Sequence, residues 1–150
     1  MEALWLAAER RSVGRREMNV VLDTNAPEVL ELRSLRRFRD DSGFVCRLAV
    51  RSRAFSAEHD FYFDRPGLQA FVKNLTAMDH DLTGRAELRT PYEDDRIALE
   101  VVPTGSVLVS GELFEHSEHS QKLVFSFRTD QTCLGAFARQ LSLALDMPAV

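Results

Sequence analysis

Two stretches of this chain place an aromatic strand end directly before an amphipathic helix, and they constrain the fold more than any other feature. The first reads FYFDRPGLQAF over residues 61–71, and the second reads FSFRTDQTCLGAF over residues 125–137. Both lead into Leu-x-Ala-Phe-x-x-x-Leu, which puts three apolar side chains on one helix face. An internal duplication would explain the repeat, as would two helices that solve the same packing problem independently. We favour the second because short matches arise easily.

Residues that favour the start of a helix follow both aromatic strand ends. Asp64 can accept hydrogen bonds from the free amides of a first turn, and Pro66 has no amide to lose there. Thr129 or Asp130 has the capping role in the second stretch. Apolar residues then recur at helical spacing, namely Leu68, Phe71, Val72, Leu75 and Met78, and later Leu134, Phe137, Ala138, Leu141 and Leu145. This spacing predicts helices near residues 65–78 and 131–145.

Alternation of apolar and polar residues dominates the rest of the chain from residue 28 onward. In FVCRLAVRSR, residues 44–53, apolar side chains face one way and arginines the other, as in a strand with one buried face. Six further stretches alternate similarly: LELRSLRRF, HDFYF, LTGRAELR, RIALEVV, SVLVSGELF and KLVFSF. Polar or turn-forming residues connect them. The pattern predicts a mainly antiparallel sheet of six to seven strands in meander-like order.

The predicted strands and helices indicate an α+β fold in which two amphipathic helices pack on one face of a single sheet. A chain of 150 residues, 45% of them hydrophobic, fits one domain with a sizeable core. We place this domain at residues 18–150 and expect residues 1–17 to be a peripheral or disordered extension. Met18 is an alternative to Met1 as the natural start.

Composition and charge argue against several classes of function. The formal net charge of -4 disfavours nonspecific binding to nucleic acid or to an anionic membrane. No stretch approaches the roughly 18 apolar residues that a membrane span needs. Cys46 and Cys133 each stand alone in an apolar pattern, so we expect reduced, buried thiols and a cytoplasmic protein. We expect no cofactor.

Few residues have catalytic or metal-binding potential. His116 and His119 have His-x-x-His spacing beside two glutamates, but they stand in a polar loop, and a solvated turn is the preferred interpretation. His59 precedes Asp60, and His80 lies between two aspartates. Because no nucleophile or phosphate-binding glycine loop accompanies these pairs, we interpret them as surface charge.

Turn alternation predicts that three acidic turns meet at one end of the sheet. Their residues are Asp40 and Asp41, then Glu93, Asp94 and Asp95, and finally Glu115 and Glu118. The prediction requires that the connection through residues 66–78 joins parallel neighbours. Three acidic turns at one edge would attract a basic partner. Ordinary solubilising loops are the simpler interpretation, because turns favour Asp in any protein.

The C-terminal sequence FSFRTDQTCLGAFARQLSLAL resembles the signature of WapI-type immunity proteins and related uncharacterised bacterial families. Those families end in an apolar strand, then Asp-Gln-Thr/Ser, then a helix with spaced Leu, Phe and Gln-Leu. The matching residues are Asp130, Gln131, Thr132, Leu134, Phe137, Gln140 and Leu141. FYFDRPGLQAFVKNL, LTGRAELRT and GSVLVSGELFEH are also similar to family stretches. The resemblance covers roughly residues 44–145, and the N-terminal part has no clear counterpart.

Two classes of function follow from these observations. The resemblance implies a non-enzymatic protein that binds and neutralises a cognate bacterial toxin through protein–protein contact. The acidic edge would then contact a basic toxin domain. The alternative is a small enzyme or ligand-binding domain with its site in the sheet or beneath the helices. A deep pocket with convergent polar groups would distinguish this alternative.

Overall fold

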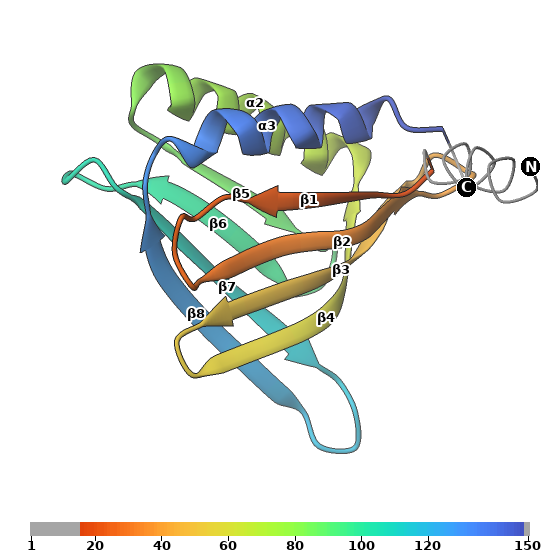
Figure 1. Ribbon diagram of the computed structural model, residues 1–150. Helices are drawn as coiled ribbons and strands as arrows, with labels where there is room; N and C mark the ends of the chain where they lie inside the picture. Colours follow the sequence, from red (N-terminus) through yellow and green to blue (C-terminus); the bar gives the residue numbers. More distant parts are fainter. Residues whose placement is uncertain (1–15, 149–150) are drawn as a thin grey trace, which may run out of the picture.

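The computed structural model describes residues 16–148, and within them the chain forms two consecutive units of four strands and a helix (Figure 1). The first unit contains β1 (Met18–Leu22), β2 (Val29–Arg37), β3 (Gly43–Ser52), β4 (Phe55–Asp64) and α2 (Arg65–Asp81). The second contains β5 (Arg85–Arg89), β6 (Arg96–Val101), β7 (Val107–Glu115), β8 (Gln121–Thr129) and α3 (Cys133–Leu145). The expectation for residues 1–17 falls mostly on residues outside the described part of the chain.

The strands form two antiparallel sheets of four strands, so the expectation of one six- to seven-stranded sheet is wrong. Sheet A has the order β1-β2-β3-β4, and sheet B has the order β5-β6-β7-β8. The division falls at α2, because this helix carries the chain away from β4 and β5 then begins a new sheet. The α+β class, the antiparallel pairing and the two helices are confirmed.

The helices lie side by side along one side of the two sheets (Figure 1). Helix α2 packs chiefly along β5, and α3 packs chiefly along β1. Each helix therefore covers the first strand of the other unit. Away from the helices, β3 of sheet A and β8 of sheet B approach each other. The sheets form a wedge that the two helices fill at its wide side.

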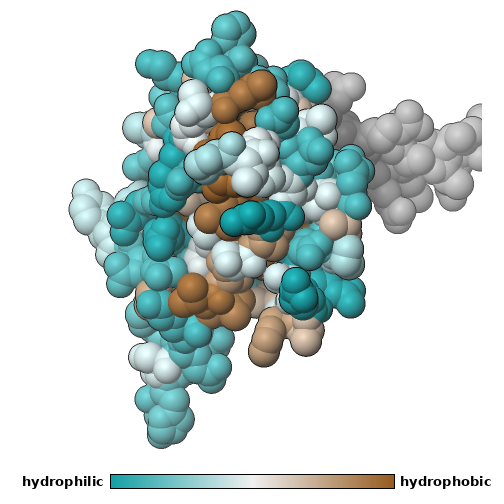
Figure 2. All heavy atoms as spheres, turned by 90° about the vertical axis from the view of Figure 1, so that its left-hand side faces the viewer, coloured by the Kyte–Doolittle hydropathy of each residue, from teal (hydrophilic) through white to brown (hydrophobic). Residues whose placement is uncertain are grey.

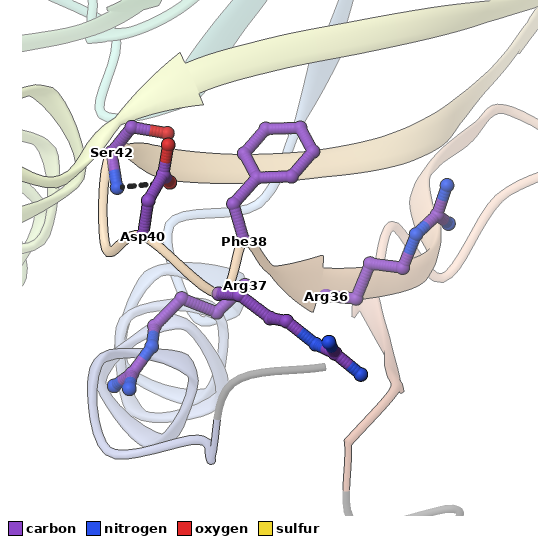
Figure 3. Close-up of a pocket in the computed structure, with 6 residues that line it drawn as sticks. Arg36, Arg37, Phe38, Asp40 and Ser42 are labelled. Carbon is purple, nitrogen blue, oxygen red and sulfur yellow. Dashed lines mark hydrogen bonds between the residues drawn. The ribbon is translucent and has the colours of Figure 1, made fainter.

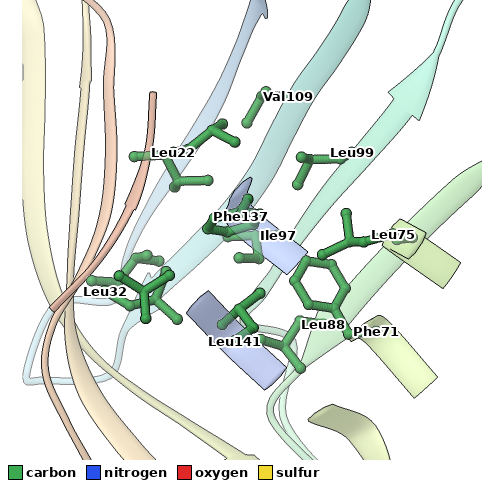
Figure 4. Close-up of a cluster of buried hydrophobic side chains, with 14 of the residues drawn as sticks. Leu22, Leu32, Phe71, Leu75, Leu88, Ile97, Leu99, Val109, Phe137 and Leu141 are labelled. Carbon is green, nitrogen blue, oxygen red and sulfur yellow. The ribbon is translucent and has the colours of Figure 1, made fainter. Parts of the chain in front are cut away.

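Apolar side chains from both sheets and both helices form one core cluster. Figure 4 shows Phe137 of α3 in the middle of this cluster, with Leu32 of sheet A on one side and Leu88 of sheet B and Phe71 of α2 on the other. The rings of Phe71 and Phe137 are fully buried and meet edge to face, with centroids 6.2 Å apart and planes at 89°. This geometry suits the aromatic quadrupoles. The two residues that the repeated motif shares therefore join the two helices to each other.

The two helices begin differently, although the sequence predicts a capping residue for each, Asp64 for the first and Thr129 or Asp130 for the second. Asp64 caps α2, because its Oδ1 accepts a hydrogen bond of 2.7 Å from the backbone N–H of Gly67. Asp130 lies three residues before α3 begins at Cys133, and its Oδ1 accepts from the N–H of Thr132 at 2.9 Å. The N-cap of α3 is Thr132, whose side chain makes no capping hydrogen bond. Asp130 shapes the turn that leads into α3 and does not cap the helix.

Replacing Asp64 with Ala is expected to lower the free energy of unfolding by about 1 kcal/mol, because the amides of the first turn lose their acceptor. Thermal or urea unfolding measures this change. Asp130→Ala is the matched comparison and should lower the free energy of unfolding by less. The Asp130 carboxylate accepts a hydrogen bond within a turn and does not cap a helix. Equal losses for the two variants would contradict the assignment of the cap.

A side-chain amide of α3 occupies the open edge of β1. The Gln140 amide accepts from the Val21 N–H at 3.0 Å and donates to the Val21 carbonyl at 2.9 Å. These are the two bonds that a neighbouring strand would make at this position. Strand β1 was not predicted from its short sequence, and Gln140 was noted only as part of the family resemblance.

Candidate functional site

The three turns that the sequence predicts at one edge lie at different points along strand β4. The connection through residues 66–78 joins two different sheets, so the parallel pair that this prediction required does not form. The β2–β3 turn lies at the C-terminal end of β4, where Gly43 pairs with Asp64. The β5–β6 turn reaches the same strand further along, because the Thr90 hydroxyl donates to the Tyr62 carbonyl at 2.8 Å. The start of the β7–β8 hairpin faces residues 56–59 across an open hollow of about 260 Å³. We call these three turns, residues 38–42, 90–95 and 115–120, the β4 turn edge.

The first of these turns has mixed charge and not the acidic character that the sequence suggested. The Asp41 carboxylate lies 3.5 Å from Nε of Arg37 and 3.7 Å from Nη1 of Arg65. Figure 3 shows Arg36, Arg37 and Phe38 around an open hollow of about 550 Å³ beside Asp40. Asp40 and Asp41 therefore lie among arginines. The alternating strand pattern did not predict these arginines at the turn.

Hydrogen bonding within the same turn favours the charged form of Asp40. Bonds from the hydroxyl and then the backbone N–H of Ser42 lower the pKa of the Asp40 carboxyl below its ordinary value. Asp40 is exposed and stays ionised near neutral pH. Asp40 therefore adds negative charge to this surface, and the neighbouring arginines offset that charge.

The second turn divides its three acidic residues between surface and interior. Glu93 and Asp94 are exposed, whereas Asp95 retains only 5% of its accessible surface. One oxygen of the Asp95 carboxylate accepts from the Phe114 N–H at 2.8 Å, and the other lies 3.2 Å from Nε2 of His59. Asp95 thus links β4 to β7, and its carboxylate is not exposed for contact with a partner.

His59 also differs from its predicted role as surface charge beside Asp60. Its ring faces Asp95, and its side chain retains 23% of its accessible surface. Asp60 instead lies 3.1 Å from Arg47 on the exposed face of sheet A. Neighbours in a strand point to opposite faces, which is why His59 and Asp60 have different partners.

The third turn carries Glu115 and Glu118, both exposed. His116 stacks on Phe114 with ring centroids 6.1 Å apart, and Nζ of Lys122 lies 5.2 Å from the centroid of the same phenyl ring. Within residues 16–148, no three His, Cys, Asp or Glu residues form a group that could hold a metal ion. The third turn therefore combines exposed carboxylates with an aromatic and cationic stack at its base.

The remaining chemistry-bearing residues have structural or surface roles. Burial raises the pKa of Cys46 to about 12 and that of Cys133 to about 11, so neither unpaired thiol is a nucleophile near neutral pH. His80 is exposed at the end of α2, where its hydrogen bond to Asp81 raises the pKa of the imidazole. This pair agrees with the surface-charge interpretation.

The side of the molecule that faces left in Figure 1 carries apolar patches between hydrophilic side chains (Figure 2). At the N-terminal end of β4, an open hollow of about 630 Å³ lies between the β3–β4 hairpin and β8. It is lined in part by Phe55 and Val124, which are 73% and 62% exposed. The hollow is open to solvent and lacks the depth and convergent polar groups that an enzyme site would show.

Each turn of the turn edge also has an aromatic residue in it or at its base, which the charge pattern of the sequence did not predict. Phe38 in the first turn packs against Tyr62 with ring centroids 5.6 Å apart, and Tyr92 is fully exposed in the second turn. Phe114 lies at the base of the third. The sequence TPYEDD contained one usable signal, because a large aromatic residue directly after proline in a polar turn is unusual.

The architecture defines the class first: an α+β protein of two units, each with four antiparallel strands and a helix. A solved structure described as "Crystal structures of trypanosoma bruciei MRP1/MRP2" is similar, with a TM-score of 0.53 and 12% identity. The similarity covers 93% of this chain and 91% of that chain, and it shows a shared fold. A comparison with curated proteins found no match.

The family follows from the sequence. The model of the immunity protein WapI-like family matches residues 21–147, and the chain belongs to this family. The match extends to the N-terminal strands, where no counterpart was expected. Neither helix of the described residues is long and apolar enough to cross a membrane.

Proposed function

We propose that this protein neutralises a cognate bacterial toxin by direct, non-catalytic contact through the β4 turn edge. Membership of the immunity protein WapI-like family supports an immunity role in general. The specific proposal rests on the contacts that hold the first two turns against β4, and on the third turn, which faces the same strand across an open hollow. We place this contact in the cytoplasm and expect it to require no cofactor.

The partner that this edge suits is a toxin domain with a basic surface, such as one that acts on RNA. The exposed acidic residues of the second and third turns are Glu93, Asp94, Glu115 and Glu118. Asp40 and Asp41 add carboxylates at the arginine-rich end of this edge. The arginines there suit acidic residues on the toxin. Asp95 supports the second turn from within. Occupying the basic surface of the toxin would prevent its substrate from binding there.

Reversing Glu93 and Asp94 to Lys should slow association with the toxin at least tenfold at low salt, because exposed complementary charge accelerates encounter. The dissociation rate should change less. The difference should shrink as salt rises, since exposed charges are screened over about 8–10 Å. Surface plasmon resonance with the toxin domain encoded beside this gene measures both rates.

The matched control reverses Asp79 and Asp81, two exposed acids at the far end of α2, which makes the same change in net charge. That variant should lose much less of the association rate. Equal slowing by the two double variants would show that only net charge matters and that this edge is not the contact surface.

A further inference from the structure

Tyr92 stands at the tip of the second turn in a conformation that side chains rarely adopt. It is fully exposed, at 107% of the reference area, and its φ is 63°. The Glu93 N–H donates to the Thr90 carbonyl at 3.2 Å, which closes a four-residue turn with Pro91 in its second position. The third position of such a turn, with positive φ, normally holds Gly or Asn. A tyrosine there opposes the local backbone preference and buries no surface of its own.

The base of this turn is held firmly on both sides. Thr90 and Asp95 are buried, and the Thr90 N–H donates to the Asp95 carbonyl at 3.0 Å. The Thr90 hydroxyl bonds to β4, and the Asp95 carboxylate bonds to β7 and faces His59. The tip is therefore fixed relative to both sheets. A rigid aromatic side chain loses little conformational freedom when a partner covers it.

The surroundings of Tyr92 have the composition of a protein interface. Aromatic residues and arginine are enriched at the centres of protein–protein contacts, and Tyr is prominent among the residues that dominate binding. The turn edge has an aromatic residue at each turn, Phe38, Tyr92 and Phe114, with arginines around the first. Glu93 and Asp94, both exposed, follow Tyr92 directly.

We propose that Tyr92 is the anchor of the toxin contact and that its ring receives an arginine or lysine side chain of the toxin. The cation lies against the face of the ring, while the neighbouring carboxylates of Glu93 and Asp94 accept its hydrogen bonds. This inference rests on the proposed function, because it names the group on the toxin that the same edge binds. Tyr92 then determines mainly the dissociation rate of the complex, and Glu93 and Asp94 determine mainly its association rate.

Tyr92→Gly is the decisive variant, since glycine adopts the required φ without strain and removes the ring. The variant should be at least as stable as the wild type in urea unfolding. It should bind the toxin domain encoded beside this gene about 30-fold more weakly, the effect typical of a dominant interface residue. The loss should appear in the dissociation rate, with the association rate nearly unchanged.

Two further variants make the test specific. Tyr92→Phe keeps the ring and should retain most of the affinity. Phe55→Ala removes another exposed aromatic residue at the opposite end of sheet A and should leave the affinity unchanged. A loss with Phe55→Ala equal to that with Tyr92→Gly would overturn the assignment to Tyr92.

The outcomes separate this inference from the function on which it rests. If the wild-type protein does not bind the toxin domain, the proposed function is overturned and the role of Tyr92 with it. If the wild type binds and Tyr92→Gly binds equally well, only the role of Tyr92 is overturned. If Tyr92→Gly lowers the unfolding midpoint, the ring contributes to the fold and the anchor assignment is wrong.

Discussion

Truncating Phe71 or Phe137 to Ala is expected to lower the free energy of unfolding by about 3–5 kcal/mol, which is a large part of the stability of a small domain. Both rings are fully buried, and each removes apolar surface from water where two helices and two sheets meet. Neighbouring side chains belong to both helices and both sheets and cannot all move to fill the cavity. Urea unfolding followed by circular dichroism measures the loss.

The two rings should also be coupled to each other. Because they meet edge to face, the double variant should lose less stability than the sum of the single variants, by about 0.5–1.5 kcal/mol. Phe55→Ala is the control, since that ring is 73% exposed and its loss should cost little. A loss for Phe71→Ala no larger than that of the control would mean that the helices pack elsewhere.

Asp95→Ala is expected to cost about 3 kcal/mol, which would make it the most destabilising substitution among the seven acidic residues of the three turns. The change removes a charge-assisted hydrogen bond to the Phe114 N–H and the acceptor that faces His59, and it leaves a buried donor without a partner. The affected contacts join β4 of sheet A to β7 of sheet B. The substitution should therefore weaken the contact between the two sheets.

Asp94 supplies the matched comparison for this prediction. It is the same residue type one position earlier, it is exposed, and Asp94→Ala should change stability by no more than about 0.5 kcal/mol. Thermal unfolding of the two variants in parallel gives the difference. Similar melting temperatures for the two would show that the Asp95 carboxylate makes no bonds that matter to the fold.

The helices could be predicted from the sequence because their signals are local. Apolar residues at helical spacing run from Leu68 to Met78 and from Leu134 to Leu145, and each set follows a strand end with a turn-forming acid. The same periodicity places Phe71 and Phe137 on the buried faces, as the structure confirms. Only the role of Asp130 differed, since a capping residue and a turn residue look alike in sequence.

The division into two sheets could not be read from the same pattern. Alternation shows that one face of a strand is buried, but it is silent on whether another sheet or a helix covers that face. Strand β5 alternates in the same way whether it pairs with β4 or begins a new sheet. The repeated strand-to-helix motif was the one hint, but without β1 the predicted order was three strands and a helix, then four strands and a helix, so the equal composition of the two units was not visible.

The turn edge illustrates how far sequence reasoning reaches at a surface. Turn alternation treats all acidic residues of a turn alike, but Asp94 and Asp95 are the same residue type and have opposite environments. The contacts that distinguish them come from His59 and Phe114, which belong to other strands. The arginines beside Asp41 are Arg37 and Arg65, and the approach of Arg65 to this turn depends on three-dimensional folding.

The bonds between Gln140 and Val21 join residues 119 positions apart, and this separation matters while the protein is being made. A ribosome completes β1 and the whole of sheet A long before it adds α3. Until then the nascent chain carries an edge strand whose N–H and C=O groups have no cover, and such edges pair with other chains. A chain released before residue 133 would keep that edge permanently bare. The last helix therefore ends a period in which each growing molecule is vulnerable to aggregation.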